Sequence, residues 1–217
     1  MASLEPVYPH KLRRLYWPFL ALAEICRDVV GTVVGSFEVD GKRYTIPRFV
    51  FHGPPAGRMP VRVGLFALLG GHELAGALGL ERLLSRLAAE PALAAGCELA
   101  VYPLCNPTGF EDGTAHNRAG RCLGREFWRG SAEPEVRILE EELRAQRFDG
   151  IVALHVGTAG AGVESLSAPP EQRPVPFRLV LDLPADVPLA PQVEAISGVL
   201  QSLVPCCHGF LNRGIQP

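Results

Sequence analysis

The chain has 217 residues, a hydrophobic fraction of 47% and a formal net charge of -2. This apolar content is enough for a full core and excludes a largely disordered chain, while the near-neutral charge excludes the basic footprint of a nucleic-acid-binding domain. No segment reaches the run of about 18 apolar residues that a membrane span needs. The length is typical of one domain, so 1–217 is predicted to be a single domain with an N-terminal helical extension over 1–30.

The N-terminal pattern has two interpretations. Basic residues within 11–14 precede an apolar run over 15–23, a pattern that secretory signals also show. The run ends at Glu24 without a good cleavage site, which favours an amphipathic first helix. The six cysteines contain no C-x-x-C pair. Without secretion, reduced thiols and a cytoplasmic location are expected.

A β-hairpin is the first predicted part of the sheet. Polar and apolar residues alternate over 31–38 and 43–51, and Asp40-Gly41 between them is a typical hairpin turn. Pro47 lies inside the second segment and lacks a backbone N–H. It therefore predicts that this strand lies at an edge of the sheet.

Strands and helices then alternate. The nearly continuous apolar run over 61–69 is typical of a strand buried on both faces. Leucines at helical spacing predict a helix over 74–89, and 97–104 reads as another short buried strand. The polar stretch 106–130 is too long for an ordinary connection, and such loops are often functional.

The C-terminal half continues the alternation. Ser131 is predicted to cap a helix that has Pro134 in its first turn. Buried strands are predicted over 148–156 and 176–183. The last helix has an apolar stripe formed by Val193, Ile196, Leu200 and Leu203.

This order predicts an α/β fold with a mixed, mainly parallel sheet and helices on both faces. Ligands bind beyond the carboxyl ends of the strands in such sheets. The polar side chains expected at those ends are His72, Glu73, His155 and Asp182. Two imidazoles and two carboxylates that converge on one crevice could bind zinc and activate water.

Several motifs carry a resemblance to a known group of enzymes. Residues 71–76 read Gly-His-Glu-Leu-Ala-Gly, 106–110 read Asn-Pro-Thr-Gly-Phe, and 114–127 read Thr-Ala-His-Asn-Arg-Ala-Gly-Arg-Cys-Leu-Gly-Arg-Glu-Phe. Leu154-His155 ends a predicted strand, and 177–184 read Phe-Arg-Leu-Val-Leu-Asp-Leu-Pro. In this order the segments resemble the motifs of the zinc carboxypeptidases and of the succinylglutamate desuccinylase/aspartoacylase group, which have a three-layer α/β/α fold.

The resemblance implies a zinc hydrolase that cleaves an amide bond in a small peptide or acyl-amino acid. In these enzymes a glutamate and histidines hold the zinc, a carboxylate acts as the base, and a polar loop binds the substrate carboxylate. The residues implied here are Glu73, His155 and His72 for zinc, Asp182 for the base, and Arg125 and Asn117 for the substrate.

Departures from the motifs lead to an alternative. The first zinc ligand of the family falls on Gly70, which has no side chain, and the arginine that polarises the scissile carbonyl falls on Ala115. An asparagine of the loop motif falls on Gly124. Because a catalytic zinc normally has three protein ligands, these losses favour a non-catalytic, metal-free member that binds a ligand or partner in the former crevice.

Further alternatives stay open at this point. His52 or His116 could replace the missing ligand, or Glu73 and Arg125 could neutralise each other in a metal-free crevice. A third class of function is an interaction protein that uses the hydrophobic N-terminal helix. The substrate and the oligomeric state do not follow from the sequence.

Overall fold

The computed structural model describes residues 10–156, 166, 175 and 177–213. The strands in these ranges form one mixed sheet. Its strands are β1 (Val29–Val39), β2 (Lys42–His52), β3 (Val61–Phe66), β4 (Cys97–Tyr102), β5 (Gly150–Val156) and β6 (Phe177–Leu183). The six strands lie in the order β1-β2-β4-β3-β5-β6. The β1–β2 and β2–β4 pairs are antiparallel, and the other pairs are parallel. The predicted mixed, mainly parallel α/β sheet is confirmed.

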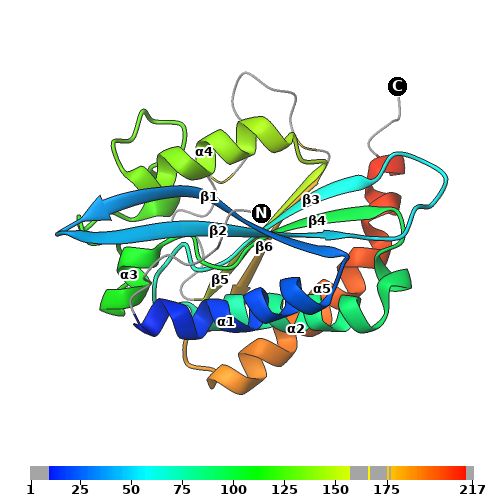
Figure 1. Cartoon of the computed structure of the whole chain (residues 1–217), viewed down its shortest axis with the longest axis horizontal. Helices are drawn as coiled ribbons and strands as arrows, with labels where there is room; N and C mark the ends of the chain where they lie inside the picture. Colours follow the sequence, from blue (N-terminus) through cyan, green and yellow to red (C-terminus); the bar gives the residue numbers. More distant parts are fainter. Residues whose placement is uncertain (1–9, 157–165, 167–174, 176, 214–217) are drawn as a thin grey trace.

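Helices cover both faces of this sheet. They are α1 (His10–Ile25), α2 (Leu74–Ala89), α3 (Pro107–Asp112), α4 (Pro134–Gln146) and α5 (Leu189–Arg213), with short 3-10 helices η1 (Pro91–Ala94) and η2 (Leu123–Arg125). Figure 1 shows α4 on one face and α1, α2 and α5 on the other. None of the helices in the described ranges is long and apolar enough to cross a bilayer.

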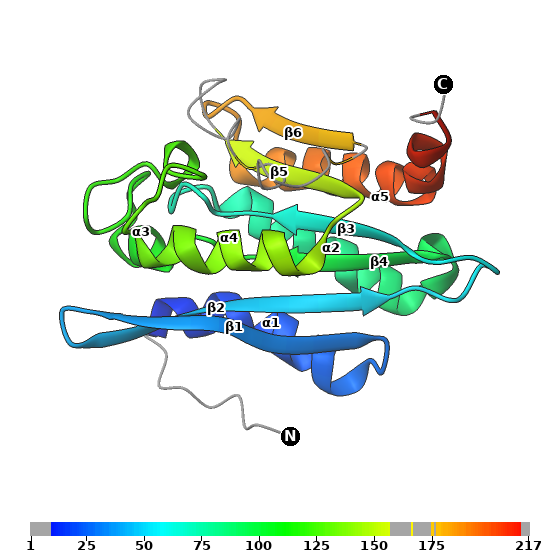
Figure 2. The ribbon, with the colours of Figure 1, turned by 90° about the horizontal axis from the view of Figure 1, so that it is seen from above.

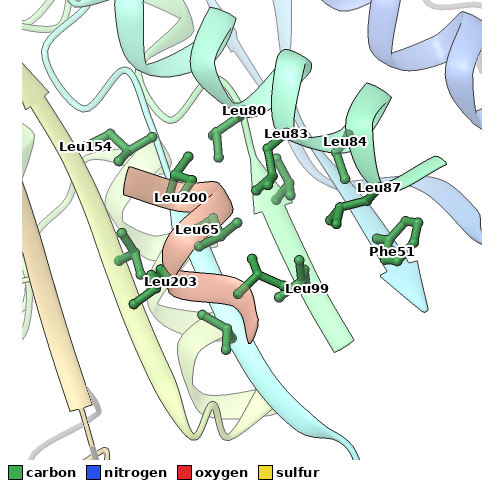
Figure 3. Close-up of a cluster of buried hydrophobic side chains, with 14 of the residues drawn as sticks. Phe51, Leu65, Leu80, Leu83, Leu84, Leu87, Leu99, Leu154, Leu200 and Leu203 are labelled. Atoms are coloured by element: carbon green, nitrogen blue, oxygen red, sulfur yellow. The ribbon is translucent and has the colours of Figure 1, made fainter. Parts of the chain in front are cut away.

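The larger core lies between the sheet and the α2–α5 layer. Leucines of α2 point towards the strands and towards α5 because they recur every three or four residues. The cluster drawn in Figure 3 includes Phe51, Leu65, Leu80, Leu83, Leu84, Leu87, Leu99, Leu154, Leu200 and Leu203. Burial of each such side chain contributes about 1.5–3 kcal/mol, so this layer fixes the position of α2.

The β1–β2 hairpin forms as predicted, but β2 is not an edge strand. Asp40 and Gly41 turn the chain with φ values of 51° and 71°. β2 lies between β1 and β4, so the edge prediction from Pro47 is wrong. The proline is tolerated because the pairing with β4 starts only at Phe49, and Pro47 lies opposite a register shift in β1.

The start of α4 also differs from the prediction. Glu133, not Ser131, is the N-cap residue. The Ser131 hydroxyl accepts the backbone N–H of Glu133 at 3.3 Å and donates to Glu126 at 3.1 Å. Ser131 therefore holds the chain that leads into α4 instead of capping the helix.

The amphipathic first helix is present as α1. Its buried side, which includes Leu12, Tyr16 and Phe19, packs on the domain, and Trp17 on the other side is 59% exposed. The Tyr16 hydroxyl donates to the Thr45 carbonyl of β2 at 3.0 Å. This helix is therefore attached to the sheet by a polar contact as well as by apolar burial.

Candidate functional site

The candidate site lies at the carboxyl ends of β3, β5 and β6. Figure 2 shows these strands pointing to the same end of the sheet, where α3 also lies. Glu73 is the last residue before α2, and His155 is the next-to-last residue of β5. Asp182 of β6 is the register neighbour of His155. Parallel pairing therefore places these three residues at one edge, as parallel α/β topology requires.

Glu73 and His155 form a buried ion pair. Their residues are 2% and 7% exposed, and Glu73 Oε1 contacts His155 Nδ1. The hydrogen bond with Glu73 raises the pKa of His155 above its ordinary value; burial opposes this shift, and the charges of Glu73 and Asp182 add to it. The carboxylate thereby favours the charged form of the imidazole.

Gly70 allows Glu73 to adopt this position. A Cβ atom added at Gly70 would lie 2.6 Å from Glu73 Oε1, and the Gly70 backbone N–H donates to Glu73 Oε2 at 3.3 Å. The carboxylate thus occupies the space into which a side chain at position 70 would extend. Glu73 can bend inward only because Gly70 has no side chain in this space.

Two of the three predicted zinc ligands, Glu73 and His155, contact each other, but His72 does not complete the set. Across the ranges that the structure describes, no group of three or more His, Cys, Asp or Glu side chains is arranged to hold a metal ion. His72 is exposed, whereas the adjacent Glu73 is buried, so the turn directs the two side chains apart. The set of Glu73, His155 and His72 therefore needs correction, because the residues present do not fit a three-ligand catalytic zinc.

The proposed replacement ligands lie elsewhere. His52 Nδ1 is 3.3 Å from Glu98 Oε2. His52 is paired in register with Glu98, the second residue of β4, which places it at the opposite edge of the sheet. His116 is exposed in the long loop. Glu73 is neutralised by His155 and not by Arg125, so the Glu73–Arg125 hypothesis is wrong.

The other predicted site residues differ in their surroundings. Asp182 is exposed beside His155, and its role as a base stays a prediction. Asn117 is buried, donates to Glu133 Oε2 at 2.6 Å and accepts the Arg121 backbone N–H at 2.9 Å. Its amide therefore holds the long loop against the chain before α4.

Arg125 contrasts with Asn117. It is exposed on η2, and within the described part of the chain its guanidinium has no ion-pair partner. A free guanidinium at this end of the sheet can bind a carboxylate through two parallel hydrogen bonds. Its predicted contact with substrate stays a prediction.

The Asn-Pro-Thr-Gly segment has a role that sequence reasoning missed. Asn106 donates to the Leu69 carbonyl at 3.1 Å and accepts the Gly109 backbone N–H at 2.9 Å. A Cβ at Gly71 would lie 2.1 Å from the Gly109 carbonyl carbon. This segment therefore braces the turn that carries Glu73, and the signal for it was an asparagine N-cap followed by proline.

A second polar cluster, the Arg118 cluster, was also missed. Arg118 contacts Glu111 at 2.7 Å and Asp112 at 2.6 Å, and it donates to the Tyr44 hydroxyl at 2.6 Å. Burial raises the pKa of Glu111, but hydrogen bonds from Tyr44, Arg118 and Lys42 outweigh it and lower that pKa to about 2. Burial and the Glu111 hydrogen bond raise the pKa of Tyr44 to about 12. The cluster ties the long loop to β2.

No protein-family model and no curated protein matches the sequence. Among solved structures, a metallo-carboxypeptidase from Burkholderia cenocepacia has a TM-score of 0.68 at 16% identity, covering 94% of this chain and 70% of that chain. One from Pseudomonas aeruginosa, in complex with (2-guanidinoethylmercapto)succinic acid, has a TM-score of 0.63 at 18% identity, covering 94% and 70%.

A provisional metallopeptidase from Shewanella amazonensis is similar over nearly its whole length. The TM-score is 0.61 at 21% identity, covering 89% of this chain and 92% of that chain. At such identities the likeness establishes the fold alone and not the activity. The chain has a metallo-carboxypeptidase-like α/β fold.

Proposed function

We propose that the chain is a non-catalytic, metal-independent relative of the zinc carboxypeptidases that binds a ligand without cleaving it. The observation that carries this proposal is the Glu73–His155 ion pair, which is closed over Gly70. In this arrangement the donors that zinc would need are bound to each other. The third donor has been replaced by a position without a side chain.

The energetics of the pair support this function. To bind zinc, the chain would have to separate Glu73 from His155, because each side chain would have to turn to the metal. The metal would then gain two protein ligands where a catalytic zinc normally has three. In the structure, in contrast, the buried carboxylate and the buried imidazole contact each other.

The ligand that we propose is a small peptide or acyl-amino acid with a free carboxylate. Arg125 is the residue that would bind this group, since it is exposed and has no ion-pair partner among the residues that the structure describes. Asn117 and Asn106 hold the surrounding loop through hydrogen bonds to Glu133 and Leu69. A cation on a braced loop binds with a smaller entropic cost than a cation on a free one.

The test compares the wild type with the Gly70→His variant, which restores the missing ligand type. Both proteins are purified without a metal-affinity tag, zinc is counted by elemental analysis, and melting temperatures are measured with and without added zinc. The three atoms nearest to a Cβ at position 70 all belong to the Glu73 side chain, which can move. We expect no bound zinc in the wild type and about one zinc per chain in the variant.

The Gly70→His/His155→Ala variant is the matched control. It should lose the zinc that the single variant gains, because it lacks the ligand on β5. A wild-type chain that carries stoichiometric zinc, loses it on His155→Ala and hydrolyses acyl-amino acids would overturn the proposal. That result would establish the zinc hydrolase, the other function that the motifs imply.

A further inference from the structure

A cavity of about 480 Å³ lies between α1, α2 and α3, outside the strand-end site. These helices lie side by side at one corner of the molecule (Figure 1). Its walls are mostly apolar and comprise Leu15, Pro18, Phe19, Leu74, Leu78 and Phe110. This volume is within the range of about 300–1,000 Å³ that small-molecule sites occupy.

The ionisable groups around this cavity are mainly basic. His10, Lys11 and Arg14 line it from the first turns of α1, and Glu81 is the one acidic residue among its described lining residues. The first turn of α1 contains no acidic residue. A helix N-terminus already carries a partial positive charge, so cations there destabilise the helix. A local arrangement that opposes stability in this way is typical of a functional site.

Lys11 is fixed at the wall of the cavity. Its Nζ donates to the carbonyl oxygens of Phe110 at 2.5 Å and Glu111 at 3.3 Å, and it lies 4.8 Å from the centre of the Phe110 ring. An ammonium group has three donors, so these bonds leave one for a ligand. Neither Lys11 nor Arg14 has a carboxylate partner within the residues described by the structure.

We propose that this cavity binds an aliphatic carboxylate. The tail would lie along the apolar walls formed by Leu15, Leu74 and Leu78, and the carboxylate would contact Lys11 and Arg14. An anion at this place would also offset the unfavourable charge at the start of α1. The site does not use the Glu73–His155 pair, so it stands or fails independently of the non-catalytic role proposed above.

Decanoate, below its micellar concentration, is the probe. Calorimetric titration of the full chain should show saturable binding of one decanoate, and the melting temperature should rise. Acetate has the same head group without a tail, and decyltrimethylammonium has the same tail with the opposite charge. Neither should bind at equal concentration. Equal binding of either compound, or no binding of decanoate, overturns the proposal.

Two variants of α1 distinguish binding by a cavity-lining arginine from a general effect of the charge of the helix. Arg13 and Arg14 are both exposed, but only Arg14 lines the cavity. Arg14→Glu should weaken decanoate binding at least tenfold, whereas Arg13→Glu, with the same change in net charge, should change it less than twofold. Both proteins should fold, since glutamate is favourable near a helix N-terminus. Equal weakening by the two substitutions would contradict a specific site.

N-decanoylglycine tests which of two ligand classes, acyl-amino acids or free fatty acids, the cavity prefers. Its carboxylate is separated from the tail by an amide. Tighter binding than decanoate would assign the cavity to acyl-amino acids, and weaker binding would assign it to free fatty acids.

Discussion

Two ionic clusters occupy the loop end of this molecule, and their polar groups are satisfied to different degrees. In the Arg118 cluster, the guanidinium lies 2.6–2.7 Å from the carboxylates of Glu111 and Asp112 and from the Tyr44 hydroxyl, so each of these groups has a partner. In the Glu73–His155 pair the His155 Nε2 atom is buried and has no hydrogen-bond partner in the described ranges. The Arg118 cluster is also the more exposed of the two, since the Arg118 side chain is 20% exposed and the His155 side chain is 9% exposed.

The contrast also concerns how each cation responds to loss of its partner. Arginine keeps its charge under all conditions in which proteins fold, whereas histidine can release its proton. A broken Arg118 cluster therefore leaves unpaired charges, while a broken Glu73–His155 pair can relax to a neutral imidazole. This difference indicates that the Arg118 cluster holds the loop and that the strand-end pair can be altered at a smaller cost.

The largest effect is expected from Arg118→Met. It removes the cation between Glu111 and Asp112 and leaves like charges close together, so unfolding free energy should fall by about 3 kcal/mol. Urea denaturation measures this loss. Arg121→Met is the control in the same loop. The Arg121 side chain is 62% exposed and its ion pair with Glu126 is weak, with 4.0 Å between the charged atoms. Its effect should stay within about 0.5 kcal/mol.

Glu111→Gln should lower stability by about 2 kcal/mol at pH 7, because it removes charge-assisted hydrogen bonds. The pKa of Glu111 is depressed to about 2 in the folded chain. Its contribution is therefore complete above the unfolded value of about 4.5 and is lost as the pH falls towards 2. Denaturation of both proteins at pH 7 and pH 3 checks this, and a difference that stays constant would contradict it.

Glu73→Gln should cost about 1–2 kcal/mol, less than Arg118→Met, because His155 can become neutral when its partner is lost. Denaturant unfolding at pH 7 gives the value. The Glu73→Gln/His155→Gln double variant tests the pairing. It should lose clearly less than the sum of the single substitutions, and simple additivity would show that the two side chains are not coupled.

Arg125→Gln should have the smallest effect on stability, within about 0.5 kcal/mol, because the side chain is exposed. Its effect should appear in binding instead. Titration with N-acetylglycine, whose acetyl group has no tail for the apolar cavity at α1, should show about a tenfold loss of affinity relative to the wild type, as expected for one charge-assisted contact. Unchanged affinity would remove Arg125 from the proposed ligand site.

Most of the fold could be predicted from local signals. The helix over Leu74–Ala89 has the predicted bounds because its leucine spacing is regular, and the β1–β2 turn follows from Asp40-Gly41. Pro47 was misleading because its effect depends on where the pairing between β2 and β4 begins. Such a register is set by tertiary packing and leaves no local trace.

The site was predictable only in part, for a similar reason. That Glu73, His155 and Asp182 meet at one edge follows from strand-end positions. That Glu73 turns back over Gly70 and pairs with His155 depends on the three-dimensional shape of the turn. The Arg118 cluster likewise joins residues far apart in sequence, Tyr44 and Arg118, which no spacing rule connects.

Gly79 of α2 has a consequence for how variants of this protein are interpreted. A Cβ at this position would lie 2.3 Å from Ile196 Cγ2 of α5, so the glycine lets the two helices pack closely. The first turns of α2 supply Leu74 and Leu78 to the cavity, and Glu73 directly precedes them. A bulkier residue at position 79 would shift the whole helix as a rigid rod. If such a variant lost binding in the cavity or lost the Glu73–His155 pair, the cause would be a displaced α2. It would not be a contact made by the substituted residue.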